Sequence, residues 1–203
     1  MPRIVAIVGR PNVGKSTLFN RLTGSRKAIV ESEPGVTRDL NLGEVEHRGR
    51  RFTLVDTGGI EPGSSADLAR QVMEQADLAI EEADLIILLM DAADGPTPTD
   101  EAVLARVRRS GKPFVVGANK IDAPAHEVRA LAFYSLGAEH VFPLSAEHAE
   151  GMTDLLDAVI ARVPEEPVAA EEGEEARIAV VGRPNVGKSS VVNRLQGYER
   201  VNV

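Results

Sequence analysis

The sequence contains no cysteine and no tryptophan among its 203 residues, and its other aromatic side chains are limited to five Phe and two Tyr. Without cysteine there is no disulfide partner and no thiolate metal site, so we expect a reducing, cytoplasmic compartment. The longest strongly apolar run, residues 85–90, is far too short to span a bilayer, and residues 3–8 resemble a strand rather than a signal peptide. We therefore expect a soluble protein with no membrane partner.

Positive charge is also in short supply, and the deficit is uneven along the chain. The formal net charge is −8, although 43% of the residues are hydrophobic, as in a globular protein. Residues 1–163 carry 18 basic and 24 acidic side chains, and residues 164–176 carry six Glu and no basic residue. Because surfaces that bind nucleic acid are rich in Lys and Arg, we expect any RNA contact to lie outside residues 1–163.

One stretch of the sequence occurs twice, 173 residues apart. Residues 9–16 read GRPNVGKS, and the same eight letters return at residues 182–189, with further matches on both flanks. This indicates the tandem duplication of a strand–loop–helix unit rather than a short-period repeat. The second copy consists of Gly182, Arg183, Pro184, Asn185, Val186, Gly187, Lys188 and Ser189.

The segment 164–176 separates the two copies. Its prolines end the preceding helix and its like charges keep it extended, so we interpret it as an acidic interdomain linker, although an acidic surface loop would have a similar composition. The prediction is one complete domain, residues 1–163, then the linker, then residues 177–203 as the first strand, loop and helix of a second domain. Because the sequence ends at Val203, before any further motif of that domain, we expect the second domain to be truncated.

Hydrophobic periodicity predicts alternating strands and helices. Gly49 lies between the second and third strands and indicates an antiparallel hairpin. Thr97, Pro98 and Asp100 predict a capped helix start. The whole pattern is that of a three-layer α/β fold with a mostly parallel sheet, in which ligands bind at the carboxyl ends of the strands. The expected strands are residues 3–8, 40–47, 51–55, 85–90, 114–118 and 140–143.

The first copy of the repeat matches the pattern G-x-x-x-x-G-K-[ST], between a predicted strand and a predicted helix. Backbone N–H groups of such a loop bind phosphates, Lys15 can reach the β- and γ-phosphates, and the Ser16 hydroxyl can ligate Mg²⁺. The motif indicates a nucleoside triphosphate without identifying the base, and a plain Gly-rich turn is the alternative. The residues assigned to this part of the site are Gly9, Arg10, Pro11, Asn12, Val13, Gly14, Lys15, Ser16 and Thr17.

A second motif, Asp56, Thr57, Gly58 and Gly59, follows the third predicted strand, and Ile60 comes next. A carboxylate at this position can hold Mg²⁺ through water, and the glycines allow backbone N–H groups to approach a γ-phosphate. An ordinary turn has the same composition. Thr37, in the loop 34–39, is a third candidate ligand of Mg²⁺. The predicted metal site is therefore formed by Ser16, Thr37 and Asp56.

The base is identified by Asn119, Lys120, Ile121 and Asp122, which follow the fifth predicted strand. The Asp122 carboxylate can accept hydrogen bonds from N1–H and from the 2-amino group of guanine, and adenine offers neither donor. Asn119 can tie neighbouring loops together, and the Lys120 stem can lie along the ring. A backbone N–H in Ser145–Ala146, after the sixth strand, is expected to meet guanine O6. The alternative for this motif is a turn at the end of a strand.

The order of the motifs GRPNVGKST, PGVTRD, DTGG, NKID and SAEH resembles the tandem-GTPase family of bacterial ribosome assembly called EngA or Der. The resemblance covers the whole chain, and its most specific part is the doubled GRPNVGKS. It implies a Ras-like P-loop GTPase fold, GTP and GDP as ligands, and a role in maturation of the large ribosomal subunit. Family members carry two GTPase domains and a C-terminal KH-like domain.

The leading hypothesis is an enzyme that hydrolyses GTP and uses the γ-phosphate to order two loops, near Thr37 and after Asp56. A nucleotide switch with negligible hydrolysis and a related GTPase of tRNA modification or RNA processing are the alternatives. Ile60 stands where Ras-like GTPases place a water-orienting Gln. We therefore expect a cation to assist, and by resemblance Asn12 is a ligand for K⁺. The catalytic candidates are Asn12, Lys15, Thr37 and Gly59.

Overall fold

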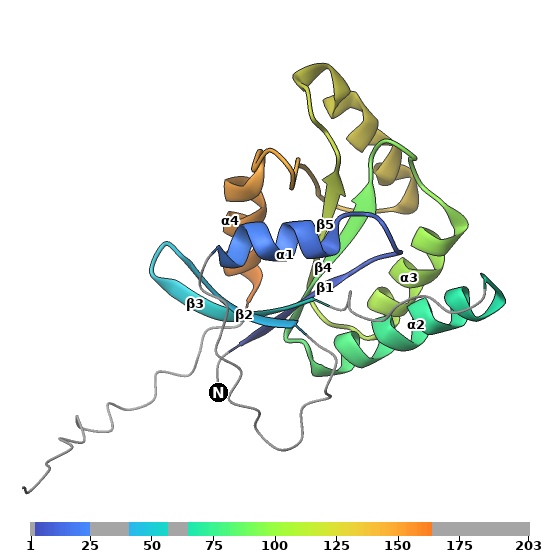
Figure 1. Cartoon of the computed structure of the whole chain (residues 1–203), viewed down its shortest axis with the longest axis horizontal. Coiled ribbons are helices and arrows are strands. Elements are labelled where there is room, and N and C mark those ends of the chain that lie inside the picture. Colours follow the sequence, from blue (N-terminus) through green and yellow to red (C-terminus); the bar gives the residue numbers. More distant parts are fainter. Residues whose placement is uncertain (1–2, 25–40, 57–64, 164–203) are drawn as a thin grey trace, which may run out of the picture. The chain divides into compact units, whose positions relative to one another are not determined.

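The structure is a computed structural model of the chain and describes residues 3–24, 41–56 and 65–163 (Figure 1). Several predictions lie outside these residues: Thr37 with its loop, Thr57 to Ile60, the linker 164–176 and the second loop copy at 182–189. They stay predictions. Among the helices that the structure describes, none has the length and apolar character needed to cross a membrane.

A six-stranded sheet forms the centre of the fold, in the order β2-β3-β1-β4-β5-β6. Neighbouring strands run parallel except for β2 and β3, which pair antiparallel. The expected α/β fold with a mostly parallel sheet is thereby confirmed for the first domain. The strands are β1 (Ile4–Val8), β2 (Asn41–His47), β3 (Arg50–Asp56), β4 (Leu85–Asp91), β5 (Phe114–Asn119) and β6 (Val141–Pro143).

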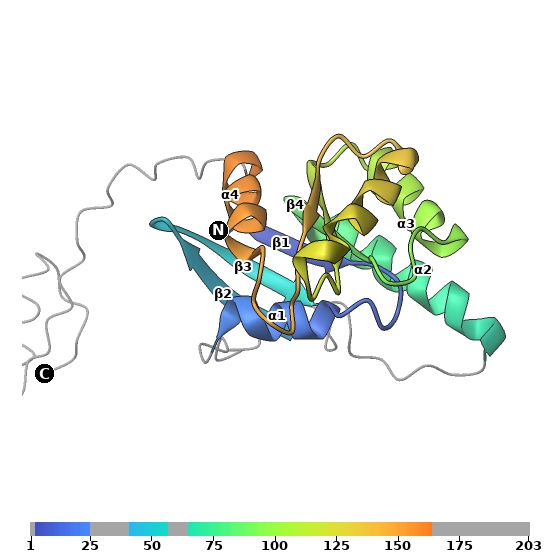
Figure 2. The same cartoon turned by 90° about the horizontal axis from the view of Figure 1, so that it is seen from above.

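Helices cover both faces of the sheet and produce the three layers seen in Figures 1 and 2. One face packs against α1 (Lys15–Thr23) and α4 (Met152–Arg162). The other face packs against α2 (Ser65–Glu82), α3 (Pro98–Arg109) and the 3₁₀ helix η1 (Pro124–Leu136). Both apolar clusters draw on the same central strands, so the sheet is buried on its two sides, as parallel sheets normally are.

Strand β4 lies between β1 and β5, and all seven of its residues are buried. Because side chains alternate along a strand, Ile87 and Leu89 join the cluster under α1 and α4, whereas Ile86 and Leu88 join the cluster under α2 and α3. Each fully buried aliphatic side chain contributes about 1.5–3 kcal/mol. The polar residue that ends this strand, Asp91, is therefore held on a rigid element.

The predicted hairpin joins β2 to β3 through Arg48 and Gly49, whose φ angles of 49° and 79° are both positive. Two such residues match a type I′ turn, in which glycine is preferred. Side chains beside the turn fasten the hairpin to α4: His47 Nε2 lies 2.6 Å from Asp157 Oδ1, and Arg48 Nη2 lies 2.5 Å from Asp157 Oδ2. Arg50 adds hydrogen bonds to carbonyl oxygens at the end of α4.

Helix η1 is the element for which the sequence analysis assigned no structure. It is a 3₁₀ helix, and its exposed apolar residues Val128, Leu131 and Tyr134 are spaced three apart. Side chains at i and i+3 eclipse one another in a 3₁₀ helix, so these residues form a stripe with period 3. Sequence patterns of period 2 or 3.6 do not detect such a segment, which explains the omission.

Candidate nucleotide-binding site

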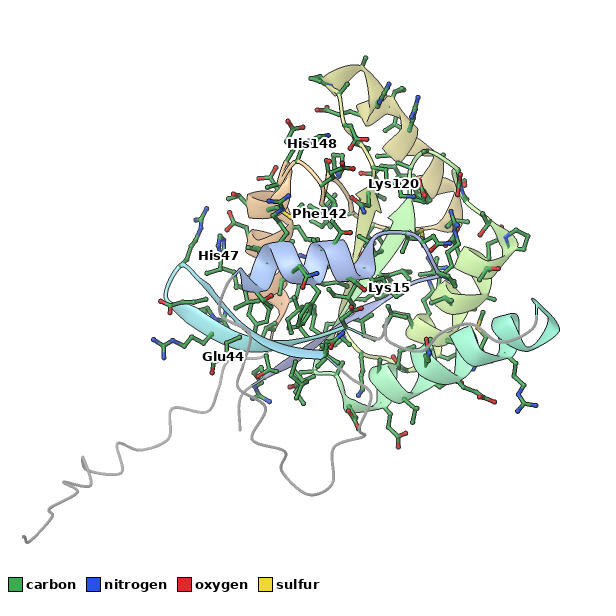
Figure 3. All side chains as sticks on the ribbon, in the orientation of Figure 1. Lys15, Glu44, His47, Lys120, Phe142 and His148 are labelled. Atoms are coloured by element: carbon green, nitrogen blue, oxygen red, sulfur yellow. The ribbon has the colours of Figure 1, made fainter. Side chains whose placement is uncertain are left out.

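The polar residues singled out in the sequence meet at one end of the sheet. The phosphate-binding loop follows β1, while Asp56, Asp91 and Asn119 are the last residues of β3, β4 and β5. These strands run parallel, so their carboxyl ends share one edge. Figure 3 labels Lys15 and Lys120, which both belong to this edge. β3, β4 and β5 each extend one residue further at their carboxyl ends than the sequence predicted, and each extra residue carries a polar side chain.

The loop from Gly9 to Ser16 is shaped by close backbone contacts. A Cβ on Gly9 would lie 2.3 Å from the carbonyl oxygen of Leu89, so only glycine allows the loop to approach β4 this closely. Gly14 has a φ of 95°, and a Cβ there would lie 2.3 Å from Asn119 Nδ2. Asn12 is exposed and has a left-handed φ of 65°. The two glycines thus fix the loop against the neighbouring strands.

Lys15, the first residue of α1, turns its side chain back over the loop. Its ammonium donates to the carbonyl oxygens of Gly9 and Arg10, both at 2.9 Å. Burial lowers the pKa of Lys15, the positive charge of Arg10 lowers it further, and Asp56 opposes this with an attraction that raises it. A partly buried cation at the start of a helix, next to backbone N–H groups, is suited to bind a phosphate.

Asn119 joins three motifs. Its Nδ2 donates to the carbonyl oxygen of Val13 in the phosphate loop at 2.8 Å, and its Oδ1 accepts from the Ala146 N–H at 2.9 Å. The side chain is buried, with 3% exposed. The expectation that Asn119 ties neighbouring loops together is therefore confirmed, and both ends of its amide are used.

Asp122 is oriented by Ser145, for which the sequence indicated only a backbone contact with the base. The Ser145 hydroxyl donates to Asp122 Oδ1 at 2.7 Å and accepts from the His148 N–H at 3.2 Å. The Ser145 N–H itself donates to the carbonyl oxygen of Glu150 at 3.1 Å. The expected contact between this segment and guanine O6 stays a prediction, and the Ser145 side chain is an additional part of the site.

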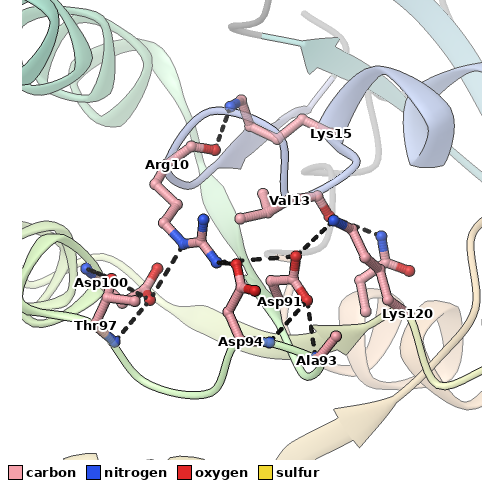
Figure 4. A network of polar contacts seen from close by, with 10 residues as sticks. Arg10, Val13, Lys15, Asp91, Ala93, Asp94, Thr97, Asp100 and Lys120 are labelled. Atoms are coloured by element: carbon pink, nitrogen blue, oxygen red, sulfur yellow. Dashed lines mark hydrogen bonds and ion pairs between the residues drawn. The ribbon is translucent and has the colours of Figure 1, made fainter. Parts of the chain in front are cut away.

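The side chain of Arg10 is directed toward acidic residues at the end of β4, in the turn after it and in α3, and the sequence did not predict these contacts. Its guanidinium lies 2.5 Å from Asp94, 3.8 Å from Asp91 and 3.6 Å from Asp100 (Figure 4). Burial lowers the pKa of Arg10, but the hydrogen bond to Asp94 and the attraction of the three carboxylates outweigh burial and raise it. One signal in the sequence could have indicated this contact. Asp91 directly follows the apolar run of β4, just as Asp56 follows the apolar part of β3.

Ser16 and Asp56 are the described members of the predicted Mg²⁺ site. Ser16 is exposed in the first turn of α1, and Asp56 is fully buried at the end of β3. Hydroxyl and carboxylate oxygens are donors that suit Mg²⁺, which is usually held by one or two protein ligands together with substrate phosphates. Among the residues that the structure describes, no group of three or more His, Cys, Asp or Glu could hold a metal. One hydroxyl and one carboxylate are a donor set that suits a Mg²⁺ whose other ligands include nucleotide phosphates.

A hollow of about 520 Å³ lies at the other end of the strands. It is lined by residues such as Lys112, Phe114 and His140, which belong to the amino ends of β5 and β6 or precede them. The nucleotide-motif residues that the structure describes are absent from its lining. Because ligands in open α/β sheets bind at the carboxyl ends of the strands, the candidate site is the cluster of motifs and not this hollow.

The fold and the clustered motifs define a P-loop GTPase domain of the α/β class. The model of the 50S ribosome-binding GTPase family matches residues 4–120 and also residues 177–203. The chain belongs to this family, and within it to the GTPases called Der. It is 54% identical over 199 residues to GTPase Der of Syntrophotalea carbinolica, a match that covers 98% of this chain and 45% of that protein. The chain thus spans less than half the length of this relative.

Solved structures of similar proteins agree with the fold. A variant of Aquifex aeolicus Era bound to GDP·AlF4⁻ superposes with a TM-score of 0.66 at 32% identity, covering 85% of this chain and 61% of that one. Era in complex with MgGDPNP and a segment of 16S ribosomal RNA gives a TM-score of 0.65 at 32% identity, with the same coverage.

Proposed function

We propose that the domain formed by residues 1–163 binds GTP and GDP and hydrolyses GTP to GDP and phosphate. The observation that carries this proposal is the position of Asn119, which connects the phosphate loop at Val13 with the segment of Ala146. One buried amide thereby holds the predicted phosphate-binding and base-binding motifs against each other, with Asp122 beside them. A phosphate-binding motif joined to a base-recognition motif suits a nucleotide better than a free phosphate.

Each residue has a role in this proposal. The N–H groups of residues 9–17 and the Lys15 ammonium bind the phosphates, and Asp122 recognises the guanine edge. Ser16, Asp56 and Thr37 hold Mg²⁺, which neutralises charge on the β- and γ-phosphates when bound. Gly59 and its neighbours offer backbone N–H groups to the γ-phosphate, so the loops around Thr37 and after Asp56 respond to its presence.

The wider role that we propose is cytoplasmic assembly of the large ribosomal subunit. The support comes from the 50S ribosome-binding family and from the Der relatives. The solved structure of Era with a segment of 16S ribosomal RNA supports a ribosomal role in general, rather than a role on the large subunit in particular. Residues 1–163 carry more acidic than basic side chains, so we expect the ribosomal contact to be made outside them. We also propose that residues 164–176 form a linker between domains and that residues 177–203 belong to a second GTPase domain.

The test of base recognition is the Asp122→Asn variant. Wild type should bind GDP and not ADP, whereas the variant should lose affinity for GDP by about 3 kcal/mol and gain affinity for xanthosine diphosphate. Titration calorimetry measures all three ligands. Asp154→Asn, which changes an exposed Asp in the first turn of α4, is the matched control and should bind GDP as wild type does. Unchanged GDP affinity in Asp122→Asn would show the assignment to be wrong.

The alternative is a nucleotide switch with negligible hydrolysis, which Ile60 favours because its side chain cannot orient water. A single-turnover assay of phosphate release from GTP separates the two. Phosphate release that is faster than uncatalysed GTP hydrolysis, and that is lost when Lys15 is replaced, supports an enzyme. Tight binding without release would leave the switch as the function of this chain.

A further inference from the structure

The Asp91 carboxylate serves two groups of partners with its two oxygens. Oδ1 accepts from the N–H groups of Ala93 and Asp94, at 2.8 and 3.4 Å, and this fixes the turn after β4. Oδ2 faces the cations: it lies 2.5 Å from Lys120 Nζ and 3.8 Å from Arg10 Nη2 (Figure 4). One oxygen thus fixes the turn, while the other pairs with Lys120 of the base motif and lies near Arg10 of the phosphate loop.

Asp91 is ionised at neutral pH despite being only 2% exposed. Burial raises the pKa of Asp91, but the hydrogen bonds from Lys120 and from the Ala93 and Asp94 N–H groups, with the charge of Lys120, bring it below the usual value. A buried carboxylate of this kind depends on its partners and in turn restrains them, because separating the charges would leave one of them buried and uncompensated. Asp91 and Lys120 therefore stabilise each other's positions.

We propose that Asp91 is a positioning residue for nucleotide binding: it holds Lys120 in place for the base. The inference rests on the proposed function and deepens it. Lys120 has a left-handed φ of 69°, and 42% of its side chain is exposed, so its four-carbon stem needs an anchor. Asp91 supplies that anchor from a strand buried on both faces. Pre-ordering the stem reduces the entropy lost when a base binds.

A neighbouring residue provides the matched control. Asp94 pairs with the same Arg10, at 2.5 Å, but its side chain is 57% exposed and it lies on the outer side of the network. Exposed ion pairs contribute little. Replacing Asp94 by Asn removes the same charge, next to the same cation, while the bond between Asp91 and Lys120 is retained.

The experiment measures GDP affinity and GTP turnover of the 203-residue chain. In Asp91→Asn the amide oxygen can still accept at the turn, but the amide nitrogen cannot accept from Lys120. We expect the Kd for GDP to rise about tenfold, with KM for GTP rising similarly and kcat changing less than about twofold. Asp94→Asn should stay within about twofold of wild type in both quantities.

A double-mutant cycle shows whether Asp91 acts through Lys120. Lys120→Met should itself weaken GDP binding, and adding Asp91→Asn should then weaken it little further. Additive losses, or an unchanged Kd in a folded Asp91→Asn protein, would overturn the inference. Should Asp91→Asn fail to fold, Lys120→Met decides, since GDP affinity equal to wild type in that variant also refutes the positioning role. A wild-type chain that binds no GDP would instead overturn the proposed function itself.

Discussion

At the scale of single residues, the site is built from side chains that each satisfy two neighbours. Asn119 contacts Val13 and Ala146 with opposite ends of one amide, and the Ser145 hydroxyl both donates to Asp122 and accepts from His148. Removing one partner of a buried pair costs more than the pair contributes, because the other partner is left unsatisfied. Substitutions at such residues should therefore affect binding and stability together.

Asn12 differs from these residues because it is exposed and has a left-handed backbone. Its carbonyl oxygen is available to a cation beside the phosphates. We expect GTP turnover to be about tenfold faster in K⁺ than in Na⁺ at equal ionic strength, since the smaller Na⁺ fits the same oxygens less well. In Asn12→Ala the preference should vanish. Equal rates of wild type in the two salts would show that Asn12 has another role, such as stabilising the loop.

At the scale of elements, α3 begins with the capping box that the sequence predicted. The Thr97 side chain accepts from the Asp100 N–H, and Asp100 Oδ2 accepts from the Thr97 N–H at 3.0 Å. We expect Thr97→Ala to lower the free energy of unfolding by about 1 kcal/mol and Tm by about 2–4 °C. Thr99→Ala, inside the first turn, is the control and should change Tm less. Thermal unfolding followed by circular dichroism measures both, and equal shifts would contradict the cap.

The elements that the sequence predicted well are those with local signals. Strand β4 is a continuous apolar run, the hairpin has Gly49 at its turn, and α3 has its cap within four residues. Helix η1 was missed because its period of three follows neither standard pattern. The ends of β3, β4 and β5 were placed one residue short, because polar residues at strand ends do not look like strand. In the structure these residues are buried, and each pairs with a residue of a neighbouring strand.

The candidate site was predicted in its motifs but not in its long-range contacts. Arg10 and Asp94 are 84 positions apart, and Lys120 meets Asp91 only because β4 and β5 are neighbours in the sheet. Sequence reasoning without a fold cannot pair one surface Arg with one of many Asp residues. The pairing follows from the strand order, which brings the carboxyl ends of β1, β4 and β5 side by side.

At the scale of the whole molecule, the sequence GRPNVGKS occurs twice in the chain, whereas the base-recognition sequence NKID occurs once. Residues 177–203 match the GTPase family yet contain no counterpart of residues 119–122. We expect the 203-residue chain to bind close to one GDP, because a phosphate loop alone lacks the guanine contacts that supply specificity. Calorimetric titration gives the stoichiometry. A value near two would mean that the second loop binds nucleotide without a base motif.

Gly14 and Asn119 also have a consequence for how this domain can change over generations. A Cβ at position 14 would lie 2.3 Å from the Asn119 amide, so any larger residue there displaces the side chain that joins the two halves of the pocket. Mutations at the two positions are therefore not independent. The loop after β1 and the end of β5 therefore constrain each other, and a chimera that combines a larger residue at position 14 with Asn119 should fail to bind GDP even when it folds.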